Sequence, residues 1–427
     1  MEVTETTENN NQSLDDVCVY NAKQYGDEFV GLKYENKKLT VQFPYGYRKA
    51  ESQKEQRKDI LNLISVLSSF SAHRDSYYPE GNNSKKLKQF PIHSYIHIIT
   101  SFMNYGYYKE TEIVYKKNNT GKISWNKTIK SVTPQLINDK SYYFDFITRN
   151  INYNVSELIT KIHEYIVYES FEKIGFLFCS YLPAKPTLKF NKKLFTIIIK
   201  SKMAETFNER TLLLFKNMLD IIDYLDSDSE NTNYYYGVNR FDHVWESMIN
   251  DVYGIDDKQN YYPRCYWNIN GKVIDFKDDD FRSTTLRPDT IMITGRNTPE
   301  QKIFILDAKN YKYGVTPSTY NLPASDSITK QLAYGDYIYK QECEGKMHKS
   351  KEIYNAFILP YDSHDTTGNV NPKLFGYASS DYVKEDERNY YKIWGVLLDI
   401  KNLMYNHTAK NSKAIEELAK IIDGKSL

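Results

Sequence analysis

Two short apolar runs, separated by a turn-rich segment, constrain this chain more than any other feature. The runs occupy residues 290–294 and 302–306, and residues 295–301 between them are rich in Gly, Asn and Pro. Runs of this length bounded by turn residues are typical of two strands joined in an antiparallel hairpin. Because opposed residues in such a hairpin are equally far from the turn, Asp289 and Asp307 are predicted to lie at the same end of the ladder.

A third charge follows on the same strand face. Lys309 lies two residues beyond Asp307 and points the same way, whereas Ala308 points to the opposite face. Two carboxylates beside one ammonium suit a hard divalent cation such as Mg²⁺, with Asp289 and Asp307 as ligands. Lys309 would position or help deprotonate an attacking water and offset developing negative charge. The alternative is a solvated hairpin with ordinary surface charges, because Pro-Asp and Asp-x-Lys are each common.

The sequence segments around these charged residues resemble those of a known protein family. Pro288-Asp289 followed by Asp307-Ala-Lys309 resembles the PD-(D/E)XK nuclease signature, with Asp as the acidic third element. Longer stretches resemble, in order, the LlaJI family of restriction endonucleases, relatives of the McrC nuclease subunits. These stretches are residues 29–33, 121–129, 241–246, 286–289, 306–311 and 327–334, so the resemblance covers most of the chain from about Phe29 onward.

The resemblance implies further site residues on two helices. Glu246 matches an acid that the family places on its first core helix, and it borders an apolar stripe at residues 245, 248, 249 and 252. A solvent-facing helix acid is the alternative. In a later helix, Gln331 and Tyr334 match a polar pair, although Tyr here follows Gln at three positions, where related nucleases usually have four.

A basic segment precedes these motifs. Residues 109–130 contain six lysines and two acids, and residues 112–115 and 122–125 are predicted to pair as a hairpin around the loop 116–121. After the helices expected at 59–70 and 91–103, this arrangement indicates a winged helix. Solvated lysines with Trp125 packed inward are the alternative. The residues predicted to contact DNA are Lys116, Lys117, Lys122, Trp125, Asn126 and Lys127.

These observations predict four regions. Residues 1–20 form a disordered tail, 21–135 an α+β, possibly winged-helix, DNA-recognition region, 136–232 a helical connecting region and 233–427 an α/β nuclease domain. The nuclease domain is expected to have a PD-(D/E)XK restriction-endonuclease-like core, a mixed sheet flanked by helices. Its strands are predicted at 264–269, 273–276, 290–294, 302–306, 356–359 and 394–400, and its helices at 241–252, 328–341 and 414–422.

The amino-acid composition bears on how the chain attracts DNA, on whether it holds zinc or disulfides, and on its cellular location. Lys and Arg number 56 against 55 for Asp and Glu, so attraction to DNA must come from local clusters. The four cysteines are far apart, which argues against a zinc site or a disulfide framework. Without a signal peptide or a membrane-spanning stretch, the protein is expected to be cytoplasmic, with no membrane partner.

The leading prediction is a Mg²⁺-dependent, sequence-specific restriction endonuclease acting on double-stranded DNA, with a cognate DNA methyltransferase as its genetic partner. Cutting both strands would suit a homodimer on DNA. One alternative is a McrC-like nuclease subunit dependent on a separate AAA+ GTPase or ATPase, because the chain has no phosphate-binding G-x-x-x-x-G-K-[ST] loop of its own. Another is a non-catalytic DNA-binding protein on a nuclease scaffold, against which intact Asp289, Asp307 and Lys309 argue.

Overall fold

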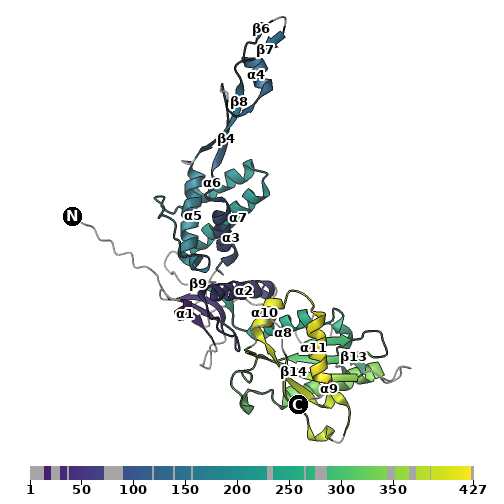
Figure 1. Ribbon diagram of the computed structural model, residues 1–427. Coiled ribbons are helices and arrows are strands. Elements are labelled where there is room, and N and C mark those ends of the chain that lie inside the picture. Colours follow the sequence, from purple (N-terminus) through teal and green to yellow (C-terminus); the bar gives the residue numbers. More distant parts are fainter. Residues whose placement is uncertain are drawn as a thin grey trace, which may run out of the picture. The chain divides into compact units, whose positions relative to one another are not determined.

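The computed structural model describes most of the chain. The described residues are 14–20, 29–35, 38–71, 90–117, 120–137, 140–154, 157–227, 234–263, 266–274, 286–343, 352–364, 372–384 and 386–424. They form two compact units (Figure 1). Unit 1 combines two separate stretches, Met1–Ser84 and Asn233–Leu427, and unit 2 is the stretch between them, Lys85–Thr232.

A five-stranded mixed sheet forms the centre of unit 1. Its strands, in spatial order, are β12 (Thr290–Thr294), β13 (Lys302–Ala308), β14 (Glu352–Tyr361), β16 (Ile393–Asp399) and β15 (Lys373–Ala378). The three central strands run parallel, and the two edge strands β12 and β15 are antiparallel to their neighbours. Every residue of β13 from Ile303 to Ala308 is buried, so both faces of this strand are covered.

Helices cover the two faces. Ile303 and Ile305 of β13 pack with Leu332 and Ile338 of α9 (Ser325–Cys343) on one face. On the other, Phe304 stacks on Tyr354, whose hydroxyl donates to Asp423 of α11 (Ser412–Asp423). Helix α8 (Phe241–Tyr253) contacts α11 and the strands β12 and β13, and α10 (Ile400–Asn406) follows β16. The expected mixed sheet flanked by helices is therefore present.

A second sheet in unit 1 joins distant parts of the chain. Its strands are β1 (Cys18–Val19), β3 (Lys38–Gln42), β2 (Val30–Glu35) and β9 (Tyr234–Val238), in that order, with α1 (Leu14–Val17) and α2 (Gln53–Ser71) beside it. Gly31 lies opposite Gly237, where a Cβ on Gly31 would come within 2.2 Å of the Tyr236 carbonyl oxygen. Only glycine permits this approach of β2 and β9.

The predicted disordered tail is partly wrong. Residues 14–19 form α1 and β1, because Leu14 and Val17 are buried and β1 pairs in parallel with β3. Residues 1–13 lie outside the described residues. The first 71 residues also share a unit with the predicted nuclease region, and not with the basic segment that follows them.

Unit 2 contains a helical bundle and a small sheet. The bundle consists of α3 (Ile92–Tyr105), α5 (Leu158–Ile174), α6 (Lys192–Glu205) and α7 (Glu209–Ser227). Helix α3 ends at Tyr105, with Gly106 as its C-cap, two residues beyond the end of the helix predicted at 91–103. The sheet has the order β4 (Glu110–Lys117), β8 (Ile147–Asn154), β5 (Lys122–Ile123), and α4 (Trp125–Ser131) and the pair β6 (Gln135–Ile137) and β7 (Lys140–Tyr142) lie between β5 and β8 in the chain.

The predicted basic hairpin is wrong. Strand β4 pairs along all eight of its residues with β8, and β5 pairs only with the other edge of β8. The chain leaves β5 after two residues because Ser124 begins a helical turn, in which buried Thr128 accepts a hydrogen bond from Ile147 N. The wing of the winged-helix prediction is therefore not formed, and the β4–β8 ladder crosses the boundary predicted at residue 135.

The remaining elements are short. They are β10 (Trp267–Ile269), β11 (Lys272–Ile274), and five 3₁₀ turns, η1 (Gly175–Leu177), η2 (Lys258–Tyr261), η3 (Thr319–Asn321), η4 (Asp381–Val383) and η5 (Asn389–Tyr391). None of the helices in the described part of the chain has both the length and the hydropathy needed to cross a bilayer.

Candidate functional site

The register of β12 and β13 brings two predicted site acids together. Thr290 pairs with Leu306, so Asp289 and Asp307, one step further along, face one another across the ladder. The backbone N–H of Ala308 donates to Asp289 Oδ2 at 2.9 Å, and the two carboxyl groups lie within hydrogen-bonding reach. The hairpin predicted from the two apolar runs is confirmed.

Lys309 contacts one of these acids directly. Its Nζ lies 2.7 Å from Asp307 Oδ2, and the two side chains are only 21% and 10% exposed. The backbone N–H of Lys309 donates to Ile358 O of β14, which fixes the residue just after β13 ends. Burial alone would lower the pKa of Lys309, but the Asp307 carboxylate outweighs it and the pKa is raised. Lys309 is therefore an ammonium held against a carboxylate.

Asp289 lies close to two other acidic side chains, those of Asp307 and Glu246. Burial, and then the nearby carboxylates of Asp307 and Glu246, raise the pKa of Asp289 to about 8. Both neighbours disfavour ionisation of Asp289, because like charges repel strongly where water is partly excluded. The arrangement is one that a bound cation would stabilise.

Glu246 lies near the same acids and belongs to α8. Trp245, the preceding residue, is fully buried, and its indole Nε1 donates to Ile358 O at 3.2 Å. Burial raises the pKa of Glu246, while the charge of His243, one turn earlier, lowers it. The apolar stripe of α8 thus packs on the sheet and leaves Glu246 at its border, as the sequence predicted.

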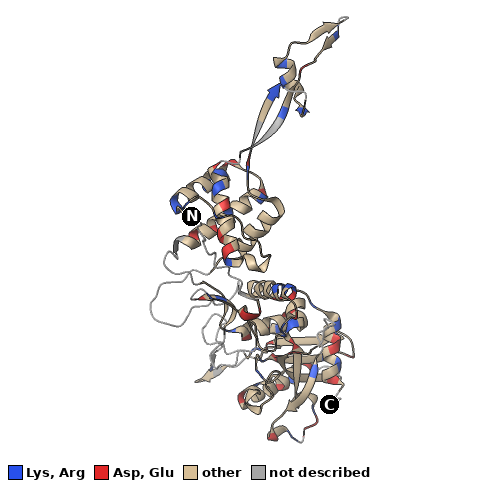
Figure 2. Cartoon of the chain, turned by 60° about the vertical axis from the view of Figure 1, so that its left-hand side comes forward, with Lys and Arg blue, Asp and Glu red and all other residues tan. Residues whose placement is uncertain are grey.

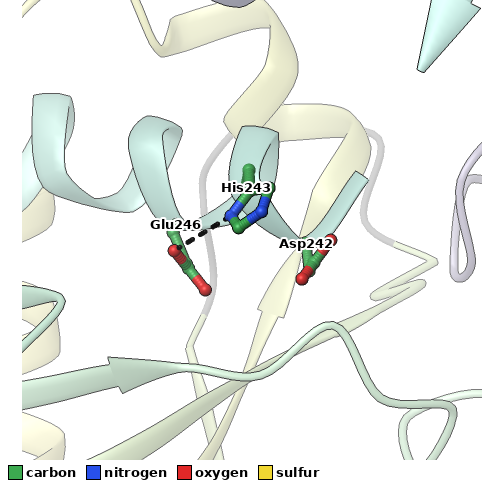
Figure 3. Close-up of side chains that lie close together, drawn as sticks. All are labelled: Asp242, His243 and Glu246. Carbon is green, nitrogen blue, oxygen red and sulfur yellow. Dashed lines mark ion pairs between the residues drawn. The ribbon is translucent and has the colours of Figure 1, made fainter. Parts of the chain in front are cut away.

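Two neighbours on α8 accompany Glu246. Asp242, His243 and Glu246 each offer a ligand atom within 4.8 Å of the others (Figure 3). Asp242 is already paired with Arg240, and His243 Nδ1 lies 3.7 Å from Glu246 Oε2. The charge of Lys309 also lowers the pKa of Glu246, which links Glu246 to the strand acids.

Gln331 and Tyr334 occupy different positions around the sheet. Gln331 is buried, and its Nε2 donates to Ile305 O at 2.8 Å and to Asn355 Oδ1 at 3.4 Å. Its amide therefore connects α9 to β13 and β14. Tyr334 is buried too, and its pKa is raised by burial and then by the charges of Asp307 and Asp289.

Sequence reasoning missed Lys258, at the start of η2. Its Nζ donates to the main-chain oxygen of Asp289 at 2.6 Å and to Asn250 Oδ1 at 2.7 Å. Burial lowers the pKa of Lys258, against the opposing effects of nearby carboxylates. Its only sequence signal is a lysine in a polar segment between α8 and β12, which does not distinguish it from surface lysines.

The residues predicted to contact DNA are all exposed in unit 2, but they do not form one surface. Tyr115, Lys122 and Arg149 are cross-strand neighbours and so share a sheet face with Lys117. Lys127 of α4 lies over the Tyr115 ring, 3.9 Å from its centroid, and Lys117 pairs with Asp145. We call Lys117, Lys122, Lys127 and Arg149 the basic strand face; basic segments recur along these strands (Figure 2).

The other predicted DNA contacts lie elsewhere. Lys116 points to the opposite face of the sheet from Lys117. Trp125 and Asn126 begin α4, and Trp125, 53% exposed, makes edge contacts with Tyr143 and Phe146. Arg149 was not predicted, because its strand partners Tyr115 and Lys122 are 34 and 27 residues away in the chain.

Comparisons with known proteins complete this picture. The family model of the LlaJI restriction endonuclease matches residues 29–388, more than half of the chain. A solved complex from Thermococcus gammatolerans, McrB AAA+ hexamers with bound McrC, contains a chain that is 12% identical, with a TM-score of 0.36 over 92% of this chain and 83% of that chain. This TM-score is too low to establish a shared fold. No curated protein matches the chain. The chain belongs to the LlaJI family of restriction endonucleases.

Proposed function

We propose that this restriction-type endonuclease is a Mg²⁺-dependent enzyme of the PD-(D/E)XK type that hydrolyses phosphodiester bonds of double-stranded DNA at a specific sequence. The observation that carries the proposal is the meeting of Asp289, Asp307 and Lys309 at one end of the β12–β13 ladder. In a chain of this family, that trio has the composition of a metal-dependent phosphodiesterase site.

The donor set fits Mg²⁺. Hard cations prefer carboxylate oxygens, which Asp289, Asp307 and Glu246 supply. Burial, and then repulsion by the other two carboxylates, raises the pKa of Asp289. Asp289 and Asp307 would hold the ion, with Glu246 as a further ligand. When bound, Mg²⁺ would polarise the phosphate and lower the pKa of a bound water.

The protein's own groups have separate tasks in this proposal. Lys309 stays protonated near neutral pH, because its pKa is raised. In this proposal it acts as a positioning group and countercharge for the attacked phosphate. Ala308 N–H orients Asp289 by donating to Oδ2. Gln331, through Ile305 O, holds the strand that carries Asp307.

DNA recognition is assigned to unit 2. The basic strand face presents four cations beside exposed Tyr115, with Lys127 over the Tyr115 ring, and would neutralise phosphates along a duplex. A homodimer on DNA would supply two sites for two strands, and a cognate methyltransferase would protect the host's own DNA. Both remain parts of the proposal.

Variants at β13 test the proposal. Asp307→Ala removes a ligand, and Lys309→Ala removes a countercharge, so each should reduce the cleavage rate by about 10²–10³ while DNA binding persists. Lys309→Arg should rescue poorly, because a planar guanidinium does not replace a compact ammonium. Lys302→Ala, on the same strand but at its other end, is the matched control and should retain cleavage.

Cleavage rate, gel-shift affinity and a thermal melt are measured for each variant, with Mg²⁺ and with EDTA. Folded Asp307→Ala or Lys309→Ala protein that cuts DNA near the parental rate would show that the site is assigned wrongly. Cleavage that persists in excess chelator would remove the metal mechanism.

A further inference from the structure

Lys258 connects the two elements that carry the proposed ligands. One hydrogen bond from its Nζ, at 2.6 Å, ends on the Asp289 carbonyl, immediately before β12. The other, at 2.7 Å, ends on Asn250 Oδ1 in the last turn of α8, one turn after Glu246. A single ammonium therefore bridges the strand that presents Asp289 and the helix that presents Glu246.

The choice of acceptor matters. Lys309 contacts the carboxylate of Asp307, whereas Lys258 binds the main-chain oxygen of Asp289 and leaves its carboxylate available. A lysine bonded in this way holds a ligand residue without competing with the metal for the ligand atoms. Groups with this role orient metal ligands, and their loss typically weakens metal binding.

Lys258 adds a side-chain link between α8 and Asp289, next to the backbone hydrogen bonds of this segment. Helix α8 ends where Gly254 N donates to Asn250 O, and Ile255 N then donates to Ile291 O of β12. The second of these bonds attaches the segment after α8 to Ile291, two residues beyond Asp289. Lys258 adds a side-chain link from Asn250 of α8 to the carbonyl of Asp289 itself.

We infer that Lys258 is a positioning residue, which sets the separation of Asp289 from Glu246 so that both can bind one divalent cation. The inference rests on the proposed Mg²⁺ site and deepens it. Lys258 touches no reacting atom in this assignment. Its removal should therefore affect metal binding more than the rate at saturating metal.

The experiment titrates the Mg²⁺ dependence of cleavage in Lys258→Met, Lys258→Arg and the control Lys302→Met, and measures Mn²⁺ binding by calorimetry on the same proteins. Lys302 is likewise a partly buried, paired lysine in unit 1, but its partner is Asp423. Lys258→Met should raise the half-saturating Mg²⁺ concentration and the Mn²⁺ dissociation constant by about 10- to 100-fold, with a smaller fall in maximal rate. Lys258→Arg should restore most of the affinity, because it still donates to both oxygens.

A double mutant separates the bridge from general destabilisation. If the two hydrogen bonds act together, Asn250→Ala combined with Lys258→Met should weaken Mn²⁺ binding no more than Lys258→Met alone. Unchanged metal titrations in Lys258→Met, or an equal change in Lys302→Met, would overturn the inference. A parental protein that neither cuts DNA nor binds Mn²⁺ would instead overturn the proposed function, and the inference with it.

Discussion

The proposed cutting residues and the proposed DNA-holding residues differ in how the fold supports them. Asp307 and Lys309 are mostly buried, bonded to each other, and fixed to strands covered on both faces. Lys122 is exposed on β5, which pairs with β8, and Lys127 is exposed on the short helix α4. A cluster of charges that must orient reacting atoms needs a rigid support, whereas charges that attract a polyanion work in solvent.

The comparison also separates stability from function. In unit 1, a substitution among the residues that support the site should destabilise the whole five-stranded sheet. In the β4–β8–β5 region of unit 2, a substitution of an exposed residue should mainly change DNA binding.

The largest expected effect compares two tryptophans. Trp245 is fully buried and donates to Ile358 O, so Trp245→Ala should destabilise unit 1 by about 3–5 kcal/mol. Trp125 is 53% exposed, so Trp125→Ala should change stability by no more than about 0.5 kcal/mol. Urea unfolding followed by circular dichroism measures both. Equal losses in the two variants would remove the contrast between the regions.

The second prediction concerns DNA binding. Lys122→Ala together with Lys127→Ala should weaken binding about tenfold at low salt and reduce the slope of log affinity against log salt by about two. Cleavage at saturating DNA should persist, because neither residue belongs to the β12–β13 site. Fluorescence anisotropy at several salt concentrations is the measurement.

Lys116→Ala provides the control for this pair, because Lys116 lies on the opposite face of the same sheet. It should leave the slope nearly unchanged. If the double variant binds like the parent, or Lys116→Ala matches the double variant, the basic strand face is not the DNA-binding surface.

The third prediction concerns metal addition. Mg²⁺ at ten times its dissociation constant should stabilise unit 1 by about 1.4 kcal/mol, because only the folded site binds it. Asp307→Asn should abolish this gain, and the double Lys122→Ala, Lys127→Ala variant should keep it. Thermal melts with Mg²⁺ and with EDTA give the comparison. A gain that survives in Asp307→Asn would place the bound ion elsewhere.

The smallest effect is a pH dependence that belongs to unit 2. Burial lowers the pKa of His163 to about 4, and its Nδ1 accepts a hydrogen bond from Tyr108 N. Below the pKa that His163 has in the unfolded chain, the unfolded chain binds a proton at His163 that the folded chain does not bind. The folded state is therefore fully stable above that pKa and loses stability as the pH falls toward the lower pKa of His163 in the folded chain.

From about pH 7.5 to about pH 6 the resulting loss should be less than about 1 kcal/mol. Urea melts of the parent and of His163→Gln at each pH measure it. His163→Gln, which cannot titrate, should show a flatter profile. Identical profiles in the two proteins would mean that His163 does not cause the dependence.

The contrast extends to what the sequence could predict. The β12–β13 hairpin was predictable because its strands are separated by one short turn, so local alternation and turn residues define its register. The same register made the meeting of Asp289 with Asp307, and the direction of Lys309, predictable. The stripe on α8 likewise located Glu246.

Longer-range pairings could not be predicted in this way. Residues 112–115 and 122–125 each have strand character, but nothing in their periodicity shows that both pair with β8 and not with each other. Lys258 is a similar case, because its role depends on where the carbonyl of Asp289 and the side chain of Asn250 meet in space. Sequence spacing carries no information about such a meeting.

The pairing of β2 with β9 also bears on how the chain is made. Tyr34 pairs with Tyr234, and all of unit 2 lies between them in the chain. The ribosome adds about 200 residues after β2 before it synthesises β9, which at about 5–20 residues per second takes about 10–40 s. Unit 2 is complete before β9 emerges, and Asp289, Asp307 and Lys309 follow still later. A nascent chain thus acquires its basic strand face well before it acquires the residues proposed to cut DNA.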